Sequence, residues 1–275
     1  VQYRPDFCHV YSPIMIILAL YIRKKTKAEI IMSLHGTDLE RIKKSKTFRF
    51  LLKLPDKLAC VSSSMVEDLK GIGYNNVEYI GNGFDKSVFN SCSIVDKKYD
   101  FLSVGNLRWQ KNHELLIDAI ELLKRNNENV KVAILGQGEL ENELKDIVIK
   151  KGLQLNIDFL GIMPRVEVAE LMRSSNFLVV TSSNEGFPKV VIEAMACGVP
   201  VISTDVGNIR DVIQDAGYIS PNFSPVTYSS LLMKALSLSK IEYDKLSSFA
   251  IQYSQNYDWE SVAERLKVTY EKDIK

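Results

Sequence analysis

Glu185 and Glu193 lie in a segment whose other side chains are mostly apolar, SNEGFPKVVIEAMACG at Ser183–Gly198. The run VVIEAMACG has the pattern of a buried helix, and Glu193 lies in its middle, eight positions after Glu185. A carboxylate is rarely buried unless it is paired or bound to something. The segment therefore predicts that these two carboxylates hold a polar ligand.

The place of this segment after a strand indicates which ligand it could hold. Phe177–Thr181 has the pattern of a buried strand, and Pro188 suits the first turn of a helix. Open α/β sheets bind ligands in such loops, and the free N–H groups of a helix amino terminus favour anions. The backbone N–H groups in question belong to Gly186, Phe187, Lys189 and Val190. Because carboxylates repel phosphate but accept hydrogen bonds from sugar hydroxyls, we expect a phosphorylated sugar or a nucleotide.

A plainer interpretation needs no ligand. Lys189 and Glu193 are four residues apart, so they could form an ion pair on one face of the helix. Glu185 would then simply be exposed. The local pattern leaves both interpretations open.

Two kinds of element alternate along the chain and must position this segment. Short runs rich in Val, Ile and Leu alternate with longer amphipathic stretches. This alternation predicts an α/β fold with parallel sheets covered on both faces. The expected strands are Phe7–Tyr11, Ile30–Leu34, Lys57–Val61, Val77–Ile80, Phe101–Val104, Val130–Leu135, Ile157–Leu160, Phe177–Thr181 and Val199–Thr204. The expected helices are Ile14–Lys25, His113–Arg125, Glu139–Lys151, Val166–Ser174, Pro188–Cys197, Ser229–Leu238 and Trp259–Glu271.

A polar stretch, DKSVFNSCSIVDKKY at 85–99, predicts a linker between two domains. We expect a partial first domain at 1–88, a second domain at 99–257, and a closing helix within 258–275 that packs back toward the first. Two complete domains of this kind would need about 300 to 400 residues. The first domain is therefore expected to lack its first strands.

Composition excludes several classes of protein. The chain has 275 residues, of which 46% are hydrophobic, and a formal net charge of +1, which argues against a dedicated nucleic-acid binder. Its four cysteines form no C-x-x-C pair and its three histidines lack metal-ligand spacing, so neither a disulfide framework nor a zinc site is expected. With no signal peptide visible and no apolar run long enough to span a bilayer, we expect a cytoplasmic protein.

Charge is uneven along the chain. Residues 1–88 hold 14 Lys and Arg against 9 Asp and Glu, whereas the remainder holds 21 against 25. Much of the excess lies in Leu39–Lys57, where seven basic residues accompany Phe48, Phe50, Leu51 and Leu52. Such a stretch could lie on an anionic membrane surface, which would make the protein peripheral on the inner face of the membrane. The alternative is a solvated helix face.

Several segments together resemble one family. EGFPKVVIEAMACGVPVI is similar to the E-x7-E signature of retaining glycosyltransferases of family 4. Other blocks resemble that family in the same order, from about residue 5 to 272. They are DFCHV, IIMSLHGTDLE, LACVSSSMVEDL, VEYIGNGFD, FLSVGNLRWQKNHELLIDAI, VAILGQGELENELK, FLGIMPRVEVAELMRSSNFLVVTS and YDWESVAERLKVTYEK.

This resemblance implies a fold and a reaction. The fold would be GT-B, two Rossmann-like domains facing a cleft, with the first domain incomplete. The reaction would move a hexosyl group from a UDP- or GDP-linked sugar to a hydroxyl of a glycan or lipid-linked acceptor, with retention at the anomeric carbon. Surface polysaccharide or glycolipid assembly would be its setting. No D-x-D motif with a metal role is present, so neither a metal ion nor a cofactor is expected.

The resemblance also implies roles for particular residues. Glu185 would contact hydroxyls of the donor sugar, and Glu193 would accept hydrogen bonds from the ribose of the nucleotide. Lys111 would stabilise the leaving diphosphate. His35, at the end of a strand, would face the donor sugar and the acceptor. The residues from Gly186 to Val190 would bind the donor between the two carboxylates.

One position departs from the family pattern. Family members usually carry Arg directly after the glycine of the first donor-domain loop, and Asn106 stands there in this chain. Either Arg108 substitutes for it, or the site has one cation fewer. The other two histidines, His9 and His113, are expected to be structural.

A glycine-rich loop also borders the expected site. Gly136 and Gly138 match the start of a G-x-G-x-x-G dinucleotide fingerprint, but Glu141 takes the place of its third glycine, so the loop does not predict a nicotinamide site. In the glycosyltransferase interpretation this loop borders the nucleotide, and the backbone of Ile162 and Met163 lies near the base.

Two other functions fit the same residues. One is a GT-B phosphorylase or a nucleotide-sugar epimerase. The other is a nucleotide-sugar-binding fragment without activity, because strands that normally supply the acceptor wall are expected to be missing.

Overall fold

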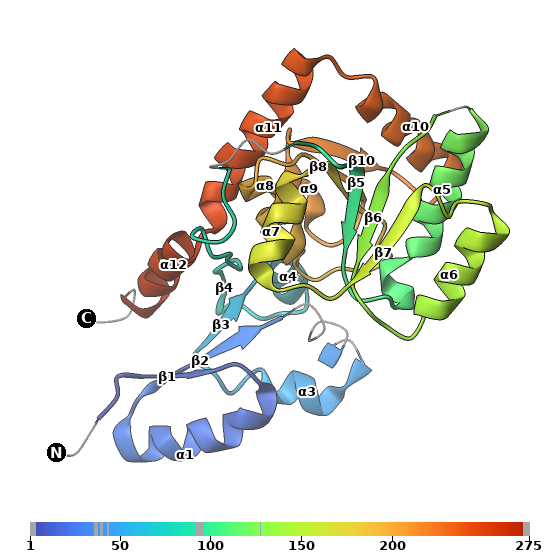
Figure 1. Ribbon diagram of the computed structural model, residues 1–275. Coiled ribbons are helices and arrows are strands. Elements are labelled where there is room, and N and C mark those ends of the chain that lie inside the picture. Colours follow the sequence, from blue (N-terminus) through green and yellow to red (C-terminus); the bar gives the residue numbers. More distant parts are fainter. Residues whose placement is uncertain are drawn as a thin grey trace. The chain divides into compact units, whose positions relative to one another are not determined.

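The computed structural model describes residues 4–35, 38, 41–42, 44–91, 96–126 and 128–271. The chain forms two compact units, one made of Val1–Gly83 with Trp259–Lys275 and the other of Phe84–Asp258 (Figure 1). Each unit contains a parallel sheet with helices on both of its faces. The α/β prediction is therefore confirmed.

The first unit is built on four parallel strands in the order β1-β2-β3-β4. The strands are β1 (Phe7–Val10), β2 (Glu29–Leu34), β3 (Lys57–Cys60) and β4 (Val77–Tyr79). The helices are η1 (Pro13–Met15), α1 (Ile16–Thr26), α3 (Lys46–Leu51), α4 (Ser63–Gly71) and α12 (Trp259–Glu271). Alternate side chains of β2 point to opposite faces. Ile30 and Met32 pack with α1 and α4, whereas Ile31 packs on the face that α12 covers.

Helix α12 belongs to this unit although it follows the second unit in the sequence. The Tyr270 hydroxyl lies 2.6 Å from His9 Nδ1 on β1, and Arg265 Nε donates to the Ile80 carbonyl at 2.8 Å. Without α12, the sheet face that carries Ile31 and Ala59 would lose its apolar cover.

The second unit is built on six parallel strands in the order β10-β9-β8-β5-β6-β7. The strands are β5 (Tyr99–Val104), β6 (Val132–Leu135), β7 (Ile157–Gly161), β8 (Ser175–Val180), β9 (Val201–Thr204) and β10 (Gly217–Ser220). The helices are η2 (Trp109–Lys111), α5 (His113–Arg125), α6 (Glu141–Lys150), α7 (Arg165–Arg173), α8 (Lys189–Ala196), α9 (Ile209–Ile213), α10 (Pro225–Leu236), α11 (Lys240–Ser254) and η3 (Gln255–Tyr257).

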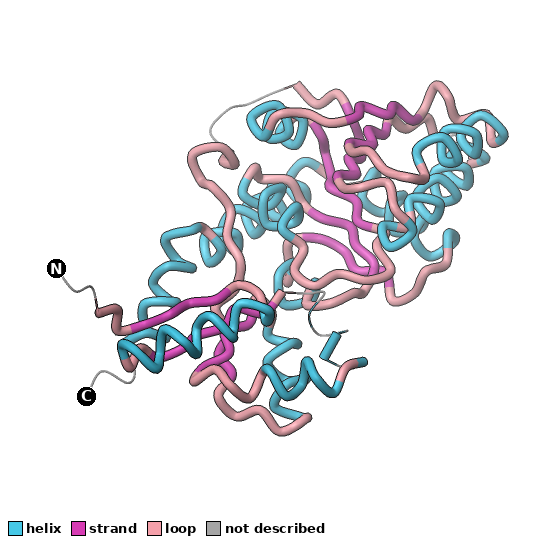
Figure 2. Tube along the Cα trace, turned by 90° about the horizontal axis from the view of Figure 1, so that it is seen from below, coloured by secondary structure: helices cyan, strands magenta, loops and turns pink. Residues whose placement is uncertain are grey.

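Helices lie on both faces of this sheet (Figures 1 and 2), and an apolar core lies between the sheet and the helices on each face. Phe101, on β5, packs with α5, α6 and α10, whereas its neighbour Leu102 packs with α7, α8 and α9. Helix α11 contributes side chains to both cores. Because β5 pairs with both β6 and β8, the strand order reverses at β5. The carboxyl ends of β5 and β8 thus form the switch point at which sheets of this kind bind ligands.

The boundary between the units falls earlier than the polar stretch at 85–99 suggested. Phe84 and Phe89 are 3% and 2% exposed in the core of the second unit. The Phe84 N–H also donates to the Tyr257 carbonyl at 3.0 Å, so the second unit begins and ends side by side. The rings of Phe84 and Phe89 pack in the core of the second unit, so residues 84–89 belong to it although their neighbours in the sequence are mostly polar. Residues 92–95 of the expected linker lie outside the described residues.

Each expected strand is present with bounds within two residues, but one strand, β10, and four helices, α3, α4, α9 and α11, were not expected. β10 is a four-residue edge strand, and α4 begins at a serine turn with a nine-residue span. The 15-residue α11 lacks a clear apolar stripe, yet Ser239 and Glu242 form a capping box at its start. That S-x-x-E pattern is a readable signal for a helix beginning.

The basic stretch Leu39–Lys57 is only partly available to a surface. Leu52 is fully buried, and Phe48 and Leu51 pack against the core of the first unit. Phe50 is 62% exposed on α3. Residues 39, 40 and 43 lie outside the described part. None of the described helices has the length and apolar character needed to cross a bilayer.

Tyr228 on α10 provides a test of how the second sheet is held. Its side chain is fully buried, and its hydroxyl lies 3.2 Å from the Val180 carbonyl and 2.9 Å from the Ile202 carbonyl. We expect Tyr228→Phe to lower the free energy of unfolding by about 1–2 kcal/mol, because a buried carbonyl loses its donor.

Tyr253→Phe is the matched control, since its hydroxyl meets the exposed Asp215 carboxylate at 3.3 Å. It should change the free energy of unfolding by less than about 0.5 kcal/mol. Chemical denaturation measures both variants, and equal losses would show that the Tyr228 hydroxyl does not hold the strands.

Candidate functional site

The loops that follow β5 and β8 are joined by hydrogen bonds at the switch point. Thr181 Oγ1 donates to the Lys111 carbonyl at 2.9 Å, and the Ser183 N–H donates to the Gln110 carbonyl at 2.8 Å. Thr204 Oγ1, at the end of β9, donates to the Ser182 carbonyl at 2.6 Å. These bonds hold the two loops together although 70 residues of chain separate them.

The joined loops bring Lys111 and Glu185 into direct contact. Lys111 Nζ lies 2.5 Å from Glu185 Oε1, and Ser182 Oγ donates to the same oxygen at 2.6 Å. The two charged side chains are 28% and 13% exposed. A largely desolvated pair of this kind is much less screened by salt than a surface pair. Two of the expected site residues are therefore neighbours.

A tight backbone approach fixes the Glu185 loop. Gly207 has φ +55°, and a Cβ atom there would lie 2.4 Å from the Glu185 carbonyl oxygen. Only a residue without a side chain allows this distance, so Gly207 keeps the loop against the end of β9. No sequence motif predicted a role for this glycine.

A small cavity lies beside the ion pair and is lined by residues of both strand ends together with His113 and Val190. His113 is 3% exposed, and its Nδ1 atom is buried without a hydrogen-bond partner among the described residues. Burial, together with the charge of Lys111, lowers the pKa of His113 to about 4. The imidazole beside Lys111 is therefore neutral at neutral pH.

Glu193 lies one helix turn inside α8, and its ionic partner comes from another helix. Arg165, the first residue of α7, donates from Nη2 to Glu193 Oε1 at 3.1 Å. Burial raises the pKa of Glu193, and the charges of Arg165 and Lys189 oppose that shift. The interpretation that paired Glu193 with Lys189 alone thus overlooked Arg165, which sequence analysis did not select.

The amino terminus of α8 is partly occupied by its own turn. The Lys189 N–H donates to the Phe187 carbonyl at 3.0 Å, so this donor is already used. The Phe187 ring packs 5.7 Å from that of Tyr257, and Pro188 is buried. Their side chains thus shape the turn from the core side, and Val190 lines the small cavity.

Gly136 allows the β5 and β6 loops to meet. It has φ +146°, and a Cβ atom there would lie 1.9 Å from the Gly105 carbonyl oxygen. Its N–H donates to the Gly161 carbonyl at 2.7 Å. The glycine expected to border a nucleotide therefore has a structural reason to be glycine.

The remaining expected residues lie at other places. Arg108 is exposed at the start of η2, and Met163 is half-buried against the core in the loop between β7 and α7. His35 belongs to the first unit, where it is exposed at the end of β2. Its N–H donates to Asp38 Oδ2 at 2.9 Å, and the Asp38 N–H donates back to the His35 carbonyl at 2.9 Å.

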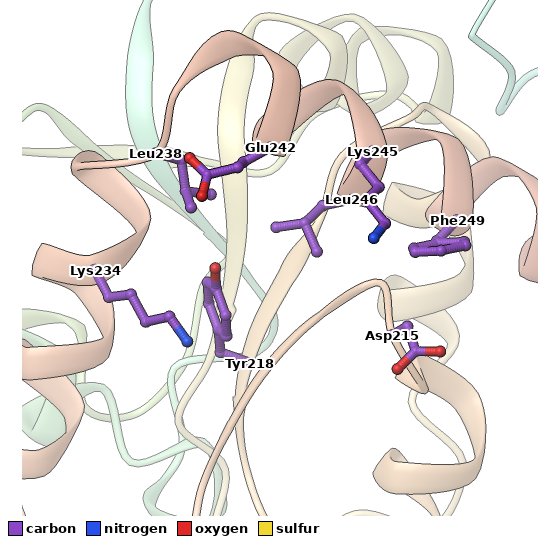
Figure 3. A pocket seen from close by; sticks show the side chains of 8 residues that line it. All are labelled: Asp215, Tyr218, Lys234, Leu238, Glu242, Lys245, Leu246 and Phe249. Atoms are coloured by element: carbon purple, nitrogen blue, oxygen red, sulfur yellow. The ribbon is translucent and has the colours of Figure 1, made fainter.

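A groove of about 520 Å³ lies elsewhere in the second unit, between α10, α11 and the start of β10 (Figure 3). Its charged side chains already have partners. Lys234 Nζ is 4.2 Å from the centre of the Tyr218 ring, Asp215 accepts from the Tyr253 hydroxyl, and Glu242 caps α11. Because the strands are parallel, this groove lies at the amino ends, away from Lys111 and Glu185. The switch point is the better candidate.

Within the described ranges, no group of three or more His, Cys, Asp or Glu side chains could hold a metal ion. Transfer without a metal ion stays a prediction.

Comparisons with known proteins agree with this arrangement. The family model for glycosyl transferases group 1 matches residues 85–253, and the model for Glycosyltransferase Family 4 matches residues 1–88. The chain belongs to the group 1 glycosyltransferases. The family predicted from the sequence is thereby confirmed.

Curated relatives extend over most of this glycosyltransferase. An uncharacterized glycosyltransferase of Methanocaldococcus jannaschii is 30% identical and covers 91% of this chain and 70% of its own length. A phosphatidylinositol N-acetylglucosaminyltransferase subunit of Arabidopsis thaliana is 26% identical, and the N-acetyl-alpha-D-glucosaminyl L-malate synthase of Bacillus anthracis is 27% identical. They cover 88% and 78% of this chain, which spans 55% and 61% of their respective lengths.

Solved structures share the fold. Sucrose-phosphate synthase from Thermosynechococcus elongatus superposes with a TM-score of 0.82 at 18% identity, over 98% of this chain and 74% of its own. Anabaena HepE in complex with UDP superposes with a TM-score of 0.83 at 17% identity, over 96% of this chain and 78% of its own. The two parallel-sheet units of this glycosyltransferase thus have the GT-B fold.

His113 gives the site a measurable pH dependence. Its pKa is about 4 in the folded protein and about 6.5 in an unfolded chain, so acidification protonates the unfolded chain first and favours unfolding. Between pH 7 and pH 5 this histidine should remove about 2 kcal/mol of stability. His113→Leu and His113→Gln should both flatten the pH dependence of the free energy of unfolding. Curves for the variants that run parallel to the wild-type curve would contradict this assignment.

Proposed function

We propose that this glycosyltransferase moves a hexosyl group from a UDP- or GDP-linked sugar to an acceptor hydroxyl, with retention at the anomeric carbon and without a metal ion. The observation that carries the proposal is the contact of Lys111 with Glu185 at the switch point of the second sheet. HepE, which shares the fold, is crystallised with UDP-glucose, and this supports a nucleotide-sugar donor.

In this proposal the donor replaces the ion pair with contacts of its own. Lys111 turns to the diphosphate and stabilises the negative charge that develops as it leaves. Glu185 accepts hydrogen bonds from hydroxyls of the sugar, while Ser182, 2.6 Å away, keeps that carboxylate oriented. Glu193 accepts from the ribose.

In this scheme retention arises because the acceptor oxygen attacks the anomeric carbon on the face from which the diphosphate leaves, without a covalent intermediate. Glu185 is assigned to sugar hydroxyls and not to the anomeric carbon, so the departing diphosphate takes the proton of the acceptor hydroxyl while the acceptor oxygen bonds to that carbon on the same face. His35 of the first unit is assigned to the donor sugar and the acceptor.

The alternatives to this function are a phosphorylase, an epimerase and a binding protein without turnover. Release of sugar 1-phosphate in the presence of inorganic phosphate would favour the phosphorylase.

Lys111 tests the catalytic part of the proposal. Lys111→Ala should lower kcat by about 100-fold or more, because the leaving diphosphate loses its cation. It should lower the free energy of unfolding by about 1–3 kcal/mol, because the largely buried Glu185 loses its cation but keeps the Ser182 hydroxyl as a donor. Thermal stabilisation by a panel of UDP- and GDP-sugars first identifies the donor, and release of free nucleotide then measures turnover.

Lys145→Ala is the matched control, because Lys145 forms an exposed ion pair with Glu141 on α6. It should leave turnover unchanged. If turnover by Lys111→Ala fell only in proportion to the fraction of folded protein, Lys111 would have a structural role. If no UDP- or GDP-sugar binds and Glu193→Ala changes nothing, the donor site itself is refuted.

For the acceptor we propose a glycan or lipid-linked molecule at an anionic membrane surface, in surface polysaccharide or glycolipid assembly. The exposed Phe50 and the basic residues Lys46, Arg49 and Lys53 of the same stretch support this proposal.

The protein should sediment with vesicles rich in phosphatidylserine at low salt and remain in solution at about 0.5 M salt, where surface charges are screened. Arg49→Glu combined with Lys53→Glu should reduce the bound fraction. Failure of the wild type to sediment would indicate a soluble acceptor.

A further inference from the structure

Arg165 makes two contacts that fix its guanidinium group beside the nucleotide end of the proposed site. Its Nη2 donates to Glu193 Oε1 at 3.1 Å, and its Cζ atom lies 5.1 Å from the centre of the Phe89 ring. Phe89 is 2% exposed, so the ring under the guanidinium is held by the core of the second unit. The Arg165 side chain is nevertheless 58% exposed.

These contacts suit a residue that orients another residue. A guanidinium is planar and carries five N–H donors in a fixed arrangement, so stacking on a ring defines the direction of its hydrogen bonds. A carboxylate has about four acceptor positions. Arg165 uses one position of Glu193, and the remaining capacity is enough for two neighbouring hydroxyls.

The charged and titratable groups around Glu193 come from several elements. Lys189 lies one turn earlier on α8, Cys197 follows the end of α8, and Arg165 comes from α7. Asp85 lies in the segment before β5. Its pKa is lowered mainly by hydrogen bonds from Ser87 and also by the charge of Arg165. Among these groups, Arg165 is the one that joins the Glu193 carboxylate by a hydrogen-bonded ion pair across two helices.

We propose that Arg165 is a positioning residue of the nucleotide subsite, which orients the Glu193 carboxylate toward the two adjacent hydroxyls of a ribose. This role rests on the proposed function. It makes Arg165 a determinant of the discrimination between ribonucleotides and deoxyribonucleotides, although Glu193 makes the contact.

The electrostatics of the pair support this role. Burial raises the pKa of Glu193, and the charge of Arg165 lowers it. Removing that charge raises the pKa further, so the carboxylate becomes protonated at a higher pH as the solution is acidified. A neutral carboxyl group is a poorer acceptor for hydroxyls, so nucleotide binding should then fail at a higher pH.

The experiment measures binding of UDP, GDP and their 2′-deoxy forms by calorimetry between about pH 5 and pH 8, the range that brackets neutral conditions. For the ribonucleotide that binds wild type, Arg165→Gln should weaken binding by about tenfold, the scale of one charge-assisted hydrogen bond. The 2′-deoxy form should lose less than about threefold, because it already lacks one of the hydroxyls. The pH at which binding is half lost should rise.

Two further variants separate positioning from folding. Arg165→Lys keeps the charge but not the planar group, so it should restore the pH profile and leave affinity reduced. Arg125→Gln removes another exposed arginine, paired with Glu121 on α5, and should behave as wild type. Thermal unfolding of each variant identifies any general loss of structure.

The outcomes also distinguish this role from the proposed function. If Arg165→Gln weakens both nucleotide forms equally with an unshifted pH profile, or behaves as Arg125→Gln does, the positioning role is refuted while the donor site stands. If wild type binds none of the four nucleotides and Glu193→Gln has no effect, both proposals are refuted.

Discussion

The hydrogen bonds between the loops after β5 and β8 are the constraint on which the candidate site depends. Thr181 and Ser183 donate to the carbonyls of Lys111 and Gln110. Strand pairing alone would bring the two strand ends close but would leave the direction of the loops open. The bonds fix that direction, and Gly207 closes the other side of the Glu185 loop. The position of each side chain at the site thus depends on backbone contacts in its surroundings.

The ion pair at the centre of the site has an energetic consequence for binding. In the structure, Lys111 and Glu185 satisfy each other. A donor that engages both must first separate them, so the stability of the pair is subtracted from the affinity of the donor. A ligand that offers only an anion, or only hydroxyls, would leave one charge half-buried without a partner. That penalty favours a ligand that carries both groups.

The strands could be predicted from the sequence because their signals are local, and the same holds for the two carboxylates of the candidate site, whereas Lys111 was selected through the family resemblance. A strand buried on both faces is a run of Val, Ile and Leu, and the spacing of Glu185 and Glu193 can be read directly. The contacts made across the fold leave no such signal. Arg165 lies 28 residues before its partner Glu193, and nothing in the α7 segment marks it. The burial of Phe84 and Phe89 was not predicted because their neighbours in the sequence are polar. Helix α11 was not predicted because its apolar pattern is weak, although it begins with a capping box.

The chain path through the two units fixes an order of events during synthesis. The second unit is continuous, and its first and last residues meet where Phe84 donates to Tyr257. The first unit is not continuous, since α12 supplies the apolar cover of the sheet face that carries Ile31. As the chain leaves the ribosome, the second unit has all of its residues before the first does. The sheet face that carries Ile31 therefore stays uncovered until α12 is made.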